Sequence, residues 1–369
     1  MPHPKLNVII SGGGTGGHIF PAVAIAQALM KLNSENNILF VGANGRMEME
    51  KVPAAGFRIQ GLNIAGLQRK LTFSNFLLPF KVIGSLWKAR AIVREFKPDV
   101  AVGVGGYASG PLLFAATSMG VPSLIQEQNS FAGVTNRILS CRAKRICVAY
   151  DGMEKYFPLE KLLLTGNPVR SDLKSLSAKR EEAFSYFGLK SDRPVLLVIG
   201  GSLGARTINQ AIAAGISLLR QEKVQLIWQT GKTGIAAAQA NVQGLDAEGI
   251  KAFDFISRMD LAYAVADVVV SRAGASSVSE LALAEKAAIL VPSPNVAEDH
   301  QTKNAMALVR KDAALLVNDR DASEQLMNAT LQLFKDTSKQ QLLRANIAKL
   351  ALPDAAEQIA EEVYRIAVK

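Results

Sequence analysis

The glycine-rich stretch near the start of the chain has the residue types best suited to chemistry. Residues 11–18 read Ser-Gly-Gly-Gly-Thr-Gly-Gly-His, between an apolar run at 6–10 that predicts a buried strand and an apolar-periodic run at 22–32 that predicts a helix. Glycines let the backbone approach a ligand closely, and the N–H groups at a helix N-terminus attract phosphates and other anions. The stretch therefore predicts an anion-binding loop, and His18 adds a side chain that titrates near neutral pH.

The same stretch argues against two common nucleotide sites. Gly12, Gly14 and Gly17 match the dinucleotide pattern G-x-G-x-x-G, but the next predicted strand, 38–41, ends in Gly-Ala-Asn without the carboxylate that would bind a ribose. A P-loop requires lysine and then serine or threonine after its last glycine, whereas His18 and an isoleucine follow here. Neither a nicotinamide enzyme nor an ATPase is favoured.

Two later polar clusters also follow predicted strands. Residues 126–129, Gln-Glu-Gln-Asn, suit a hydroxyl-rich ligand, although taken alone they are better explained by turn formation and by helix capping from the asparagine or the next serine. Residues 271–280 open a predicted helix, in which Ser277 and Glu280 have the spacing of a capping box. Alternatively, Glu280 accepts hydrogen bonds from ribose hydroxyls and the helix N-terminus binds a diphosphate.

Metal chemistry has little support in the residue types. Asp319 and Asp321 have the D-x-D form that some glycosyltransferases use for a metal, but they lie between a predicted strand and a helix, where aspartates cap. The chain has two cysteines, Cys141 and Cys147, and three histidines, so a structural zinc site is not expected. We expect reduced thiols in a cytosolic protein, and no metal.

The elements that must hold these residues alternate between strand and helix in both halves of the chain. This pattern predicts βαβ units, parallel sheets and the α/β class, with ligands beyond the carboxyl ends of the strands. We predict two doubly wound, Rossmann-like domains facing a cleft, residues 1–168 and 169–353, with Arg170 at the linker and a terminal helix at 354–369 positioned to pack back onto the first. The predicted strands cover residues 6–10, 38–41, 100–104, 123–126, 146–149, 162–165, 195–199, 224–228, 250–255, 267–270, 288–291 and 314–317.

Composition narrows the class of protein and partner. The 369 residues, 49% hydrophobic and 20% charged, suffice for two or three folded domains. No run approaches the ~18 apolar residues of a membrane span, and the N-terminal run is expected to be a first strand, not a signal peptide. The formal net charge of +10 favours an anionic partner. Without a recognisable nucleic-acid motif, that charge alone is weak support for nucleic-acid binding.

Residues 67–97 interleave phenylalanine, tryptophan and aliphatic residues with lysine and arginine, and contain a single acid, Glu95. A basic amphipathic segment of this kind binds an anionic membrane surface. A helix pair packed on the sheet with a solvated basic edge is an equally good interpretation. Both hold if part of the apolar face remains exposed.

Seven motifs together resemble the bacterial MurG-type glycosyltransferase family, and the resemblance extends over nearly the whole chain. They are Gly-Gly-Thr-Gly-Gly-His at 13–18, Gly-Gly-Tyr-Ala-Ser-Gly-Pro at 105–111, Glu-Gln-Asn at 127–129, Gly-Asn-Pro-Val-Arg at 166–170, Gly-Gly-Ser-x-Gly-Ala at 200–205, Ser-Arg-Ala-Gly-Ala at 271–275 with Glu280, and Asp-His-Gln at 299–301.

The resemblance implies a GT-B fold, with the acceptor on the N-terminal domain and the nucleotide sugar on the C-terminal domain. It implies an inverting hexosyltransferase that moves N-acetylglucosamine from UDP-N-acetylglucosamine to the 4-hydroxyl of N-acetylmuramic acid in lipid I, giving lipid II for peptidoglycan. The implied substrate-binding residues are Thr15, Gly16, Gly17, Asn129, Arg170, Ser202, Ile256, Ala275, Ser276, Ser277, Glu280 and Gln301. One departure is Leu203, where the family usually has glutamine.

These substrates imply the roles of the remaining groups. His18 is the first candidate for the base that takes the acceptor proton, and Glu127 is the second. The alternative for His18 is a loop histidine that binds phosphate or orders the turn. Helix N-termini would hold the leaving diphosphate, so neither a metal nor a cofactor is expected. The lipid acceptor implies a peripheral protein on the cytoplasmic, anionic face of the bacterial inner membrane. The alternatives are a UDP-N-acetylglucosamine epimerase, a different lipid glycosyltransferase, or a non-catalytic subunit that binds nucleotide sugars.

Overall fold

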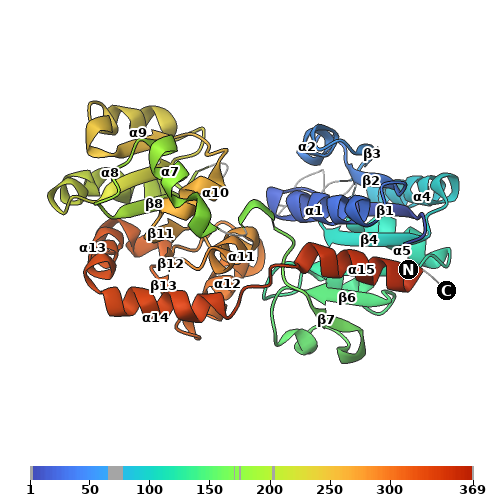
Figure 1. Cartoon of the computed structure of the whole chain (residues 1–369). Helices are drawn as coiled ribbons and strands as arrows, with labels where there is room; N and C mark the ends of the chain where they lie inside the picture. Colours follow the sequence, from blue (N-terminus) through green and yellow to red (C-terminus); the bar gives the residue numbers. More distant parts are fainter. Residues whose placement is uncertain (1–2, 65–77, 170, 174–175, 202–203, 368–369) are drawn as a thin grey trace. The chain divides into compact units, whose positions relative to one another are not determined.

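The chain divides into two compact units. The first comprises Met1–Val169 and Asp354–Lys369, and the second comprises Arg170–Pro353. Each unit is built around its own parallel sheet (Figure 1). The computed structural model describes residues 3–64, 78–169, 171–173, 176–201 and 204–367.

Seven parallel strands form the sheet of the first unit, in the order β3-β2-β1-β4-β5-β6-β7. The order runs outward in both directions from the central pair of β1 and β4. Ligands bind at such a topological switch point, beyond the carboxyl ends of the strands. The strands are β1 (Asn7–Gly12), β2 (Asn37–Ala43), β3 (Arg58–Leu62), β4 (Val100–Gly105), β5 (Ser123–Glu127), β6 (Arg145–Val148) and β7 (Leu162–Leu164).

Helices cover both faces of this sheet. Val8 and Ile10 of β1 share a core with α1 and α15, whereas Ile9 between them shares a core with α4 and α5 on the other face. This alternation is the period of two of a strand, and it makes the sheet doubly wound. The helices of this unit are α1 (Gly16–Leu32), α2 (Glu48–Ala54), α4 (Leu78–Phe96), α5 (Ser109–Ser118), α6 (Val134–Leu139) and α15 (Ala355–Ala367).

Helix α1 begins at Gly16, earlier than residue 22 where the apolar pattern predicts its start. Thr15 is extended, with φ −145° and ψ 159°, and the chain becomes helical directly after it. Pro21 lies inside the helix, where its missing N–H removes only one helical hydrogen bond. Because the helix begins at Gly16, His18 lies on its first turn and not in a loop.

Two elements of the first unit have no clear signal in the sequence. Strand β3 mixes arginine, glutamine and glycine, because it lies at the edge of the sheet and is only partly buried. Helix α2 is short and contains Pro53, which normally argues against a helix.

The second unit has six parallel strands in the order β10-β9-β8-β11-β12-β13, with its switch point between β8 and β11. Its strands are β8 (Val195–Ile199), β9 (Gln225–Gln229), β10 (Ile250–Phe253), β11 (Val268–Ser271), β12 (Ala287–Leu290) and β13 (Leu315–Leu316). Its helices are α7 (Arg180–Phe187), α8 (Arg206–Gln221), α9 (Ile235–Val242), α10 (Met259–Val265), α11 (Ala275–Leu283), α12 (His300–Val309), α13 (Ala322–Lys335) and α14 (Thr337–Ala348). Two such sheets confirm the predicted α/β class.

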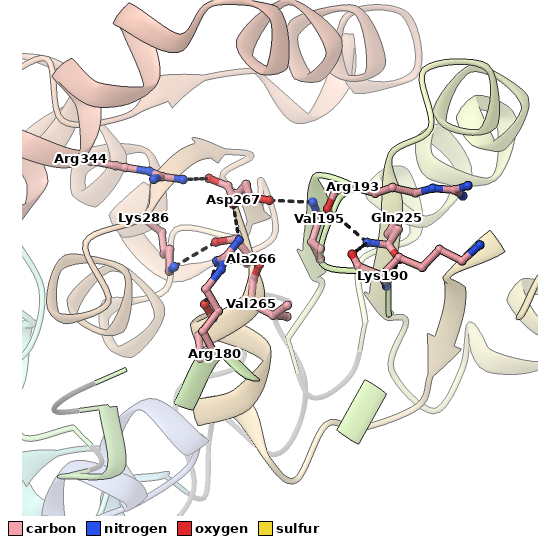
Figure 2. A network of polar contacts seen from close by, with 11 residues as sticks. Arg180, Lys190, Arg193, Val195, Gln225, Val265, Ala266, Asp267, Lys286 and Arg344 are labelled. Atoms are coloured by element: carbon pink, nitrogen blue, oxygen red, sulfur yellow. Dashed lines mark hydrogen bonds and ion pairs between the residues drawn. The ribbon is translucent and has the colours of Figure 1, made fainter. Parts of the chain in front are cut away.

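Three cations cover the C-terminal end of α10 (Figure 2). Arg180 donates to the carbonyls of residues 264 and 265 at 3.2 and 3.3 Å, Lys286 donates to that of residue 266 at 2.9 Å, and Arg344 donates to that of Asp267 at 2.7 Å. The Asp267 carboxylate pairs with Arg180 at 3.2 Å and accepts the N–H of Val195 at 2.9 Å. Positive charge at this end complements the helix dipole. The network joins α7, α10 and α14 to the start of β8.

Helix α15 packs against α1 in the first unit (Figure 1). Glu362 is buried and pairs with Arg145 at 2.5 Å and with Arg365 at 2.7 Å. The hydroxyl of Tyr364 lies 2.7 Å from the amide nitrogen of Asn36, whose oxygen accepts the N–H of Leu6 at the start of the sheet. The last helix is therefore fixed to the first unit by buried polar contacts as well as by its apolar face.

Candidate active site

His18 contacts both glycine loops of the first unit. Its Nδ1 is 3.1 Å from the carbonyl oxygen of Gly13 and 3.4 Å from Thr15 Oγ1. A carbonyl oxygen only accepts hydrogen bonds, so Nδ1 carries the hydrogen and the neutral ring has its lone pair at Nε2. A Cβ atom on Gly105 would lie 2.9 Å from Nε2, so glycine there lets the ring pack against the second loop. The arrangement gives His18 the tautomer of a general base.

The predicted residues Thr15, Gly16 and Gly17 lie where β1 passes into α1. The N–H groups of the two glycines are in the first turn, where a helix has no internal acceptor for them. The Gly13 N–H donates to the carbonyl of Gly105 at 3.3 Å, which ties the two loops together across the switch point. These residues form a helix N-terminus suited to an anion.

Glu48 of α2 binds this loop, although no motif in the sequence indicates it. It begins α2, its side chain is 1% exposed, and its carboxylate accepts the N–H of Gly14 at 2.9 Å and that of Ala43 at 3.0 Å. One N–H of the loop that the sequence offers to an anionic ligand is therefore bound to a carboxylate of the protein. Only the folded chain brings this residue, which follows β2, to the loop that follows β1.

Glu127 ends β5 as a buried carboxylate surrounded by donors. One oxygen accepts from the backbone and side-chain nitrogens of Asn129 at 3.1 and 3.3 Å, and the other accepts from the Gly133 N–H at 3.0 Å and from Asn136 Nδ2 at 2.8 Å. Burial raises the pKa of the Glu127 carboxyl, and the four N–H donors act in the opposite direction. The carboxylate holds the loop that carries Asn129. Capping by Asn129 or Ser130 is wrong, because α6 begins only after Gly133.

Three buried amides, those of Gln126, Gln128 and Asn167, join this loop to its neighbours through contacts that the sequence does not indicate. Gln128 donates to the carbonyl of Val104 at 2.7 Å, at the end of β4. Gln126 donates to Asn167 at 3.0 Å, and Asn167 donates to the carbonyl of Gln128 at 3.0 Å. The ends of β4 and β5 and the segment after β7 thus form one hydrogen-bonded platform.

The second unit has its own glycine loop after β8. Gly201 and Gly204 have φ of +83° and +81°, and a Cβ on Gly204 would lie 2.1 Å from the carbonyl oxygen of Thr230. Helix α8 begins just beyond, at Arg206, so the loop again leads to a helix N-terminus. The predicted residues Arg170, Ser202 and Leu203 lie outside the residues that the structure describes.

Helix α11 begins at Ala275 and brings Ala275, Ser276 and Ser277 into its first turn. The capping-box interpretation of Ser277 is wrong, because this residue is already inside the helix and does not precede it. Glu280 instead accepts a hydrogen bond from the hydroxyl of buried Tyr263 at 3.2 Å. That contact orients its carboxylate from α10.

Ile256 and Gln301, the other predicted residues, lie on different elements at the same end of this sheet. Ile256 follows β10, is buried, and donates its N–H to the side chain of Gln229 at 3.0 Å. Gln301 is on the first turn of α12 and accepts the N–H of Ser293 at 2.9 Å. Just before it, residues 298 and 299 have φ of +54° and +52°, a conformation unusual for residues with side chains and concentrated at functional sites.

Asp319 has a structural partner in this unit. Arg272 pairs with its carboxylate at 2.5 Å, and the hydroxyl of Thr207 donates to the same oxygen. Arg272 also donates to the carbonyls of residues 291 and 292 at 3.0 and 3.2 Å. The D-x-D aspartate thus anchors β11 and β12 to α8. Within the described ranges, no three histidine, cysteine, aspartate or glutamate side chains gather as metal ligands.

An apolar groove with a volume of about 190 Å³ lies between α4 and α5 in the first unit. Trp87 and Ile83 line it and are 72% and 52% exposed. Arg90 lines it too, and the guanidinium of Arg142 lies 4.5 Å from the ring centre of Phe114 at its edge. Arg69 and Lys70 of the predicted basic segment lie outside the described part of the chain. No described helix combines the length and apolarity needed to cross a bilayer.

The chain matches two family models in succession. The Glycosyltransferase family 28 N-terminal domain matches residues 8–148, and the Glycosyltransferase family 28 C-terminal domain matches residues 195–359. Together they cover both switch points, the glycine loops after β1, β4 and β8, and the N-terminus of α11.

The chain also matches relatives over nearly its full length. The chain is 55% identical over 364 residues to a UDP-N-acetylglucosamine--N-acetylmuramyl-(pentapeptide) pyrophosphoryl-undecaprenol N-acetylglucosamine transferase of Bacteroides fragilis, covering 98% of this chain and 96% of the relative. It is 54% identical over 367 residues to the protein of the same description from Cytophaga hutchinsonii, covering 99% and 98%. Among solved structures, Acinetobacter baumannii MurG superposes with a TM-score of 0.79 at 29% identity, covering 98% and 100%.

Proposed function

The chain belongs to glycosyltransferase family 28, among the UDP-N-acetylglucosamine--N-acetylmuramyl-(pentapeptide) pyrophosphoryl-undecaprenol N-acetylglucosamine transferases, and from this premise we propose that it transfers N-acetylglucosamine from UDP-N-acetylglucosamine to lipid I, giving lipid II. The observation that carries the proposal is the identity of 54–55% over nearly the full length of such transferases. It is a hexosyltransferase with the GT-B fold.

The rival functions have less support. An epimerase or another lipid glycosyltransferase would share the fold. The relatives reported above, however, which are more than 50% identical to this chain over nearly its full length, are transferases of one description. A non-catalytic subunit would not need the base geometry at His18. Nucleic-acid binding rests on the net charge of +10 alone.

Each unit has a distinct role in this proposal. The first unit, predicted from the sequence as residues 1–168, binds the lipid-linked acceptor, and the second unit, predicted as residues 169–353, binds the nucleotide sugar. The N-termini of α8 and α11 direct N–H groups and the positive ends of helix dipoles toward the UDP diphosphate. Arg170 and Ser202, implied by the family resemblance, are further proposed ligands of the donor. Glu280, oriented by Tyr263, accepts hydrogen bonds from the ribose hydroxyls.

His18 is the base in the proposed reaction. The acceptor hydroxyl attacks the anomeric carbon, its proton passes to His18 Nε2, and the glycosidic bond to UDP breaks with the electron pair leaving on the diphosphate. The Nδ1 hydrogen bond to Gly13 supports this role because it leaves the lone pair at Nε2. Glu127 holds the loop of Asn129 and does not take the proton, because four donors already occupy its oxygens.

The groove between α4 and α5 docks the protein on the membrane that holds the acceptor. Trp87 and Ile83 are large apolar side chains exposed beside Arg90, a combination suited to an anionic lipid surface. We place the protein peripherally, on the cytoplasmic face of the bacterial inner membrane.

UDP release tests the function most directly. We expect release from UDP-N-acetylglucosamine only when a short-chain lipid I analogue is present, and little release from UDP-glucose. Release without any acceptor would indicate a hydrolase or an epimerase-like side reaction. Donor binding without release under all conditions would favour the non-catalytic subunit.

Vesicle sedimentation tests the docking surface. Ile83→Ser and Trp87→Ser together are expected to lower binding to phosphatidylglycerol vesicles by about tenfold or more, since each side chain contributes on the order of 1 kcal/mol when partly buried. Leu342→Ser, at an α14 residue with similar exposure, is the control. Equal binding by the double variant and the control would contradict this role for the groove.

A further inference from the structure

The peptide group between Gly13 and Gly14 is held by a side chain on each side. Its N–H, on Gly14, donates to Glu48 Oε2 at 2.9 Å, and its carbonyl, on Gly13, is 3.1 Å from His18 Nδ1. The N–H and C=O of one trans peptide point in opposite directions. Glu48, the peptide and His18 therefore form a series: a carboxylate, an amide and an imidazole joined by two hydrogen bonds.

The direction of each hydrogen bond follows from the groups. The Glu48 carboxylate accepts N–H groups at both oxygens, from Gly14 and Ala43, so it acts as an acceptor on both sides. At the other end, the Gly13 carbonyl can only accept, so His18 donates from Nδ1. Hydrogen bonds in series polarise one another, so a carboxylate on the N–H strengthens the carbonyl as an acceptor. This favours a positive charge on the imidazole once Nε2 takes a proton.

Three glycines leave the space that this series occupies. A Cβ on Gly13 would lie 2.3 Å from Glu48 Oε1, and a Cβ on Gly42 would lie 2.6 Å from Glu48 Cγ. On the opposite side, a Cβ on Gly106 would lie 2.3 Å from the Gly13 carbonyl oxygen. The Glu48 side chain is 1% exposed, so water does not compete for its carboxylate. The peptide is thus confined between Glu48 and the second glycine loop.

We propose that Glu48 is a positioning residue for His18, and that it acts through the Gly13–Gly14 peptide to fix the Nδ1–H tautomer and to stabilise the imidazolium formed during transfer. The catalytic part of this inference rests on the proposed function, in which His18 is the base. The tautomer part depends on the structure alone. Glu48 plays the role of the carboxylate in a carboxylate–histidine pair, with one peptide group inserted.

Histidine-selective ¹⁵N labelling tests the inference without any substrate. The chain has only three histidines, so His18 is assigned by comparison with His18→Gln, and His3 and His300 serve as internal references. At a pH where His18 of the unmodified protein is neutral, we expect the nitrogen chemical shifts of the Nδ1–H tautomer. In Glu48→Gln, whose amide presents N–H to one of the two donors, the Nε2–H tautomer should gain population. Glu50→Gln, at an exposed glutamate on the same helix, is the matched control and should leave the spectrum unchanged.

Kinetics supply the second readout. Glu48→Gln is expected to lower kcat by about tenfold, less than the ~10²–10⁴ that a general base contributes, with KM for UDP-N-acetylglucosamine within about twofold. An Nε2–H tautomer in the unmodified protein overturns the proposal, and so does a folded Glu48→Gln protein with an unchanged tautomer ratio, whatever its kcat. If Glu48→Gln does not fold, Glu48→Asp, too short to reach both N–H groups, replaces it. An absence of transfer by the unmodified protein would refute the proposed function and leave the tautomer result intact.

Discussion

Replacing Glu127 by glutamine tests whether its carboxylate has a structural or a catalytic role. Each carboxylate oxygen accepts two N–H groups, from Asn129 on one side and from Gly133 and Asn136 on the other. Glutamine keeps one such oxygen and places an NH₂ group against the other two donors. Both of those donors are then left without an acceptor in a buried site.

The cost follows from these contacts. Each buried donor left without a partner costs about 1–3 kcal/mol, so two cost about 2–6 kcal/mol. Removing a buried charge offsets part of this, because burial raises the pKa of the Glu127 carboxyl and so disfavours its ionised form. We expect a net loss of about 2–3 kcal/mol in the free energy of unfolding, or roughly 5–10 °C in Tm for a unit of this size.

Thermal and urea unfolding measure this loss, with UDP release measured on the same samples. Glu154→Gln, at an exposed glutamate of the same unit, is the control and should stay within about 0.5 kcal/mol of the parent. Below the Tm of the variant, turnover should fall only in proportion to the disordering of the Asn129 loop. An unchanged Tm would refute the hydrogen-bond reasoning. An unchanged Tm with a loss of turnover above ~10²-fold would instead make Glu127 a base.

Three further predictions concern single side chains. His18→Ala should lower kcat by about 10²–10⁴-fold, measured by UDP release on protein shown to be folded, and full turnover would contradict its role as base. Tyr263→Phe removes the donor to Glu280 and should raise KM for UDP-N-acetylglucosamine by roughly 2–10-fold, for a hydrogen bond of about 0.5–1.5 kcal/mol; a change in kcat alone would count against a role in donor binding. Burial, followed by the charge of Arg344, lowers the pKa of Lys286 to about 8 from 10.5. The folded state therefore binds fewer protons than the unfolded state between pH 8 and 10.5, so stability from this group rises with pH across that window, by on the order of 1–3 kcal/mol. The difference in unfolding free energy between the parent and Lys286→Met should change with pH by this amount, and a pH-independent difference would contradict the reasoning.

The sequence by itself determined the architecture of both units. Apolar runs such as 195–199, which coincides with β8, predict strands because strands of a parallel sheet are buried on both faces. The pattern was least informative at the edge strand β3, where burial is partial and polar residues are tolerated. Local spacing also misled at Ser277, since a capping box requires the serine to precede the helix and α11 begins before it.

The glycine- and proline-containing motifs predicted where the loops of the site lie, because these residues determine the backbone conformation at their own positions. The partners of those loops were decided only by the tertiary structure. Glu48 and the Gly13–Gly14 peptide are distant in sequence and meet because β2 lies beside β1 in the sheet. The same holds for Tyr263 and Glu280, which belong to different helices. A side-chain hydrogen bond between separate elements depends on strand order and packing, and no local pattern in the sequence records it.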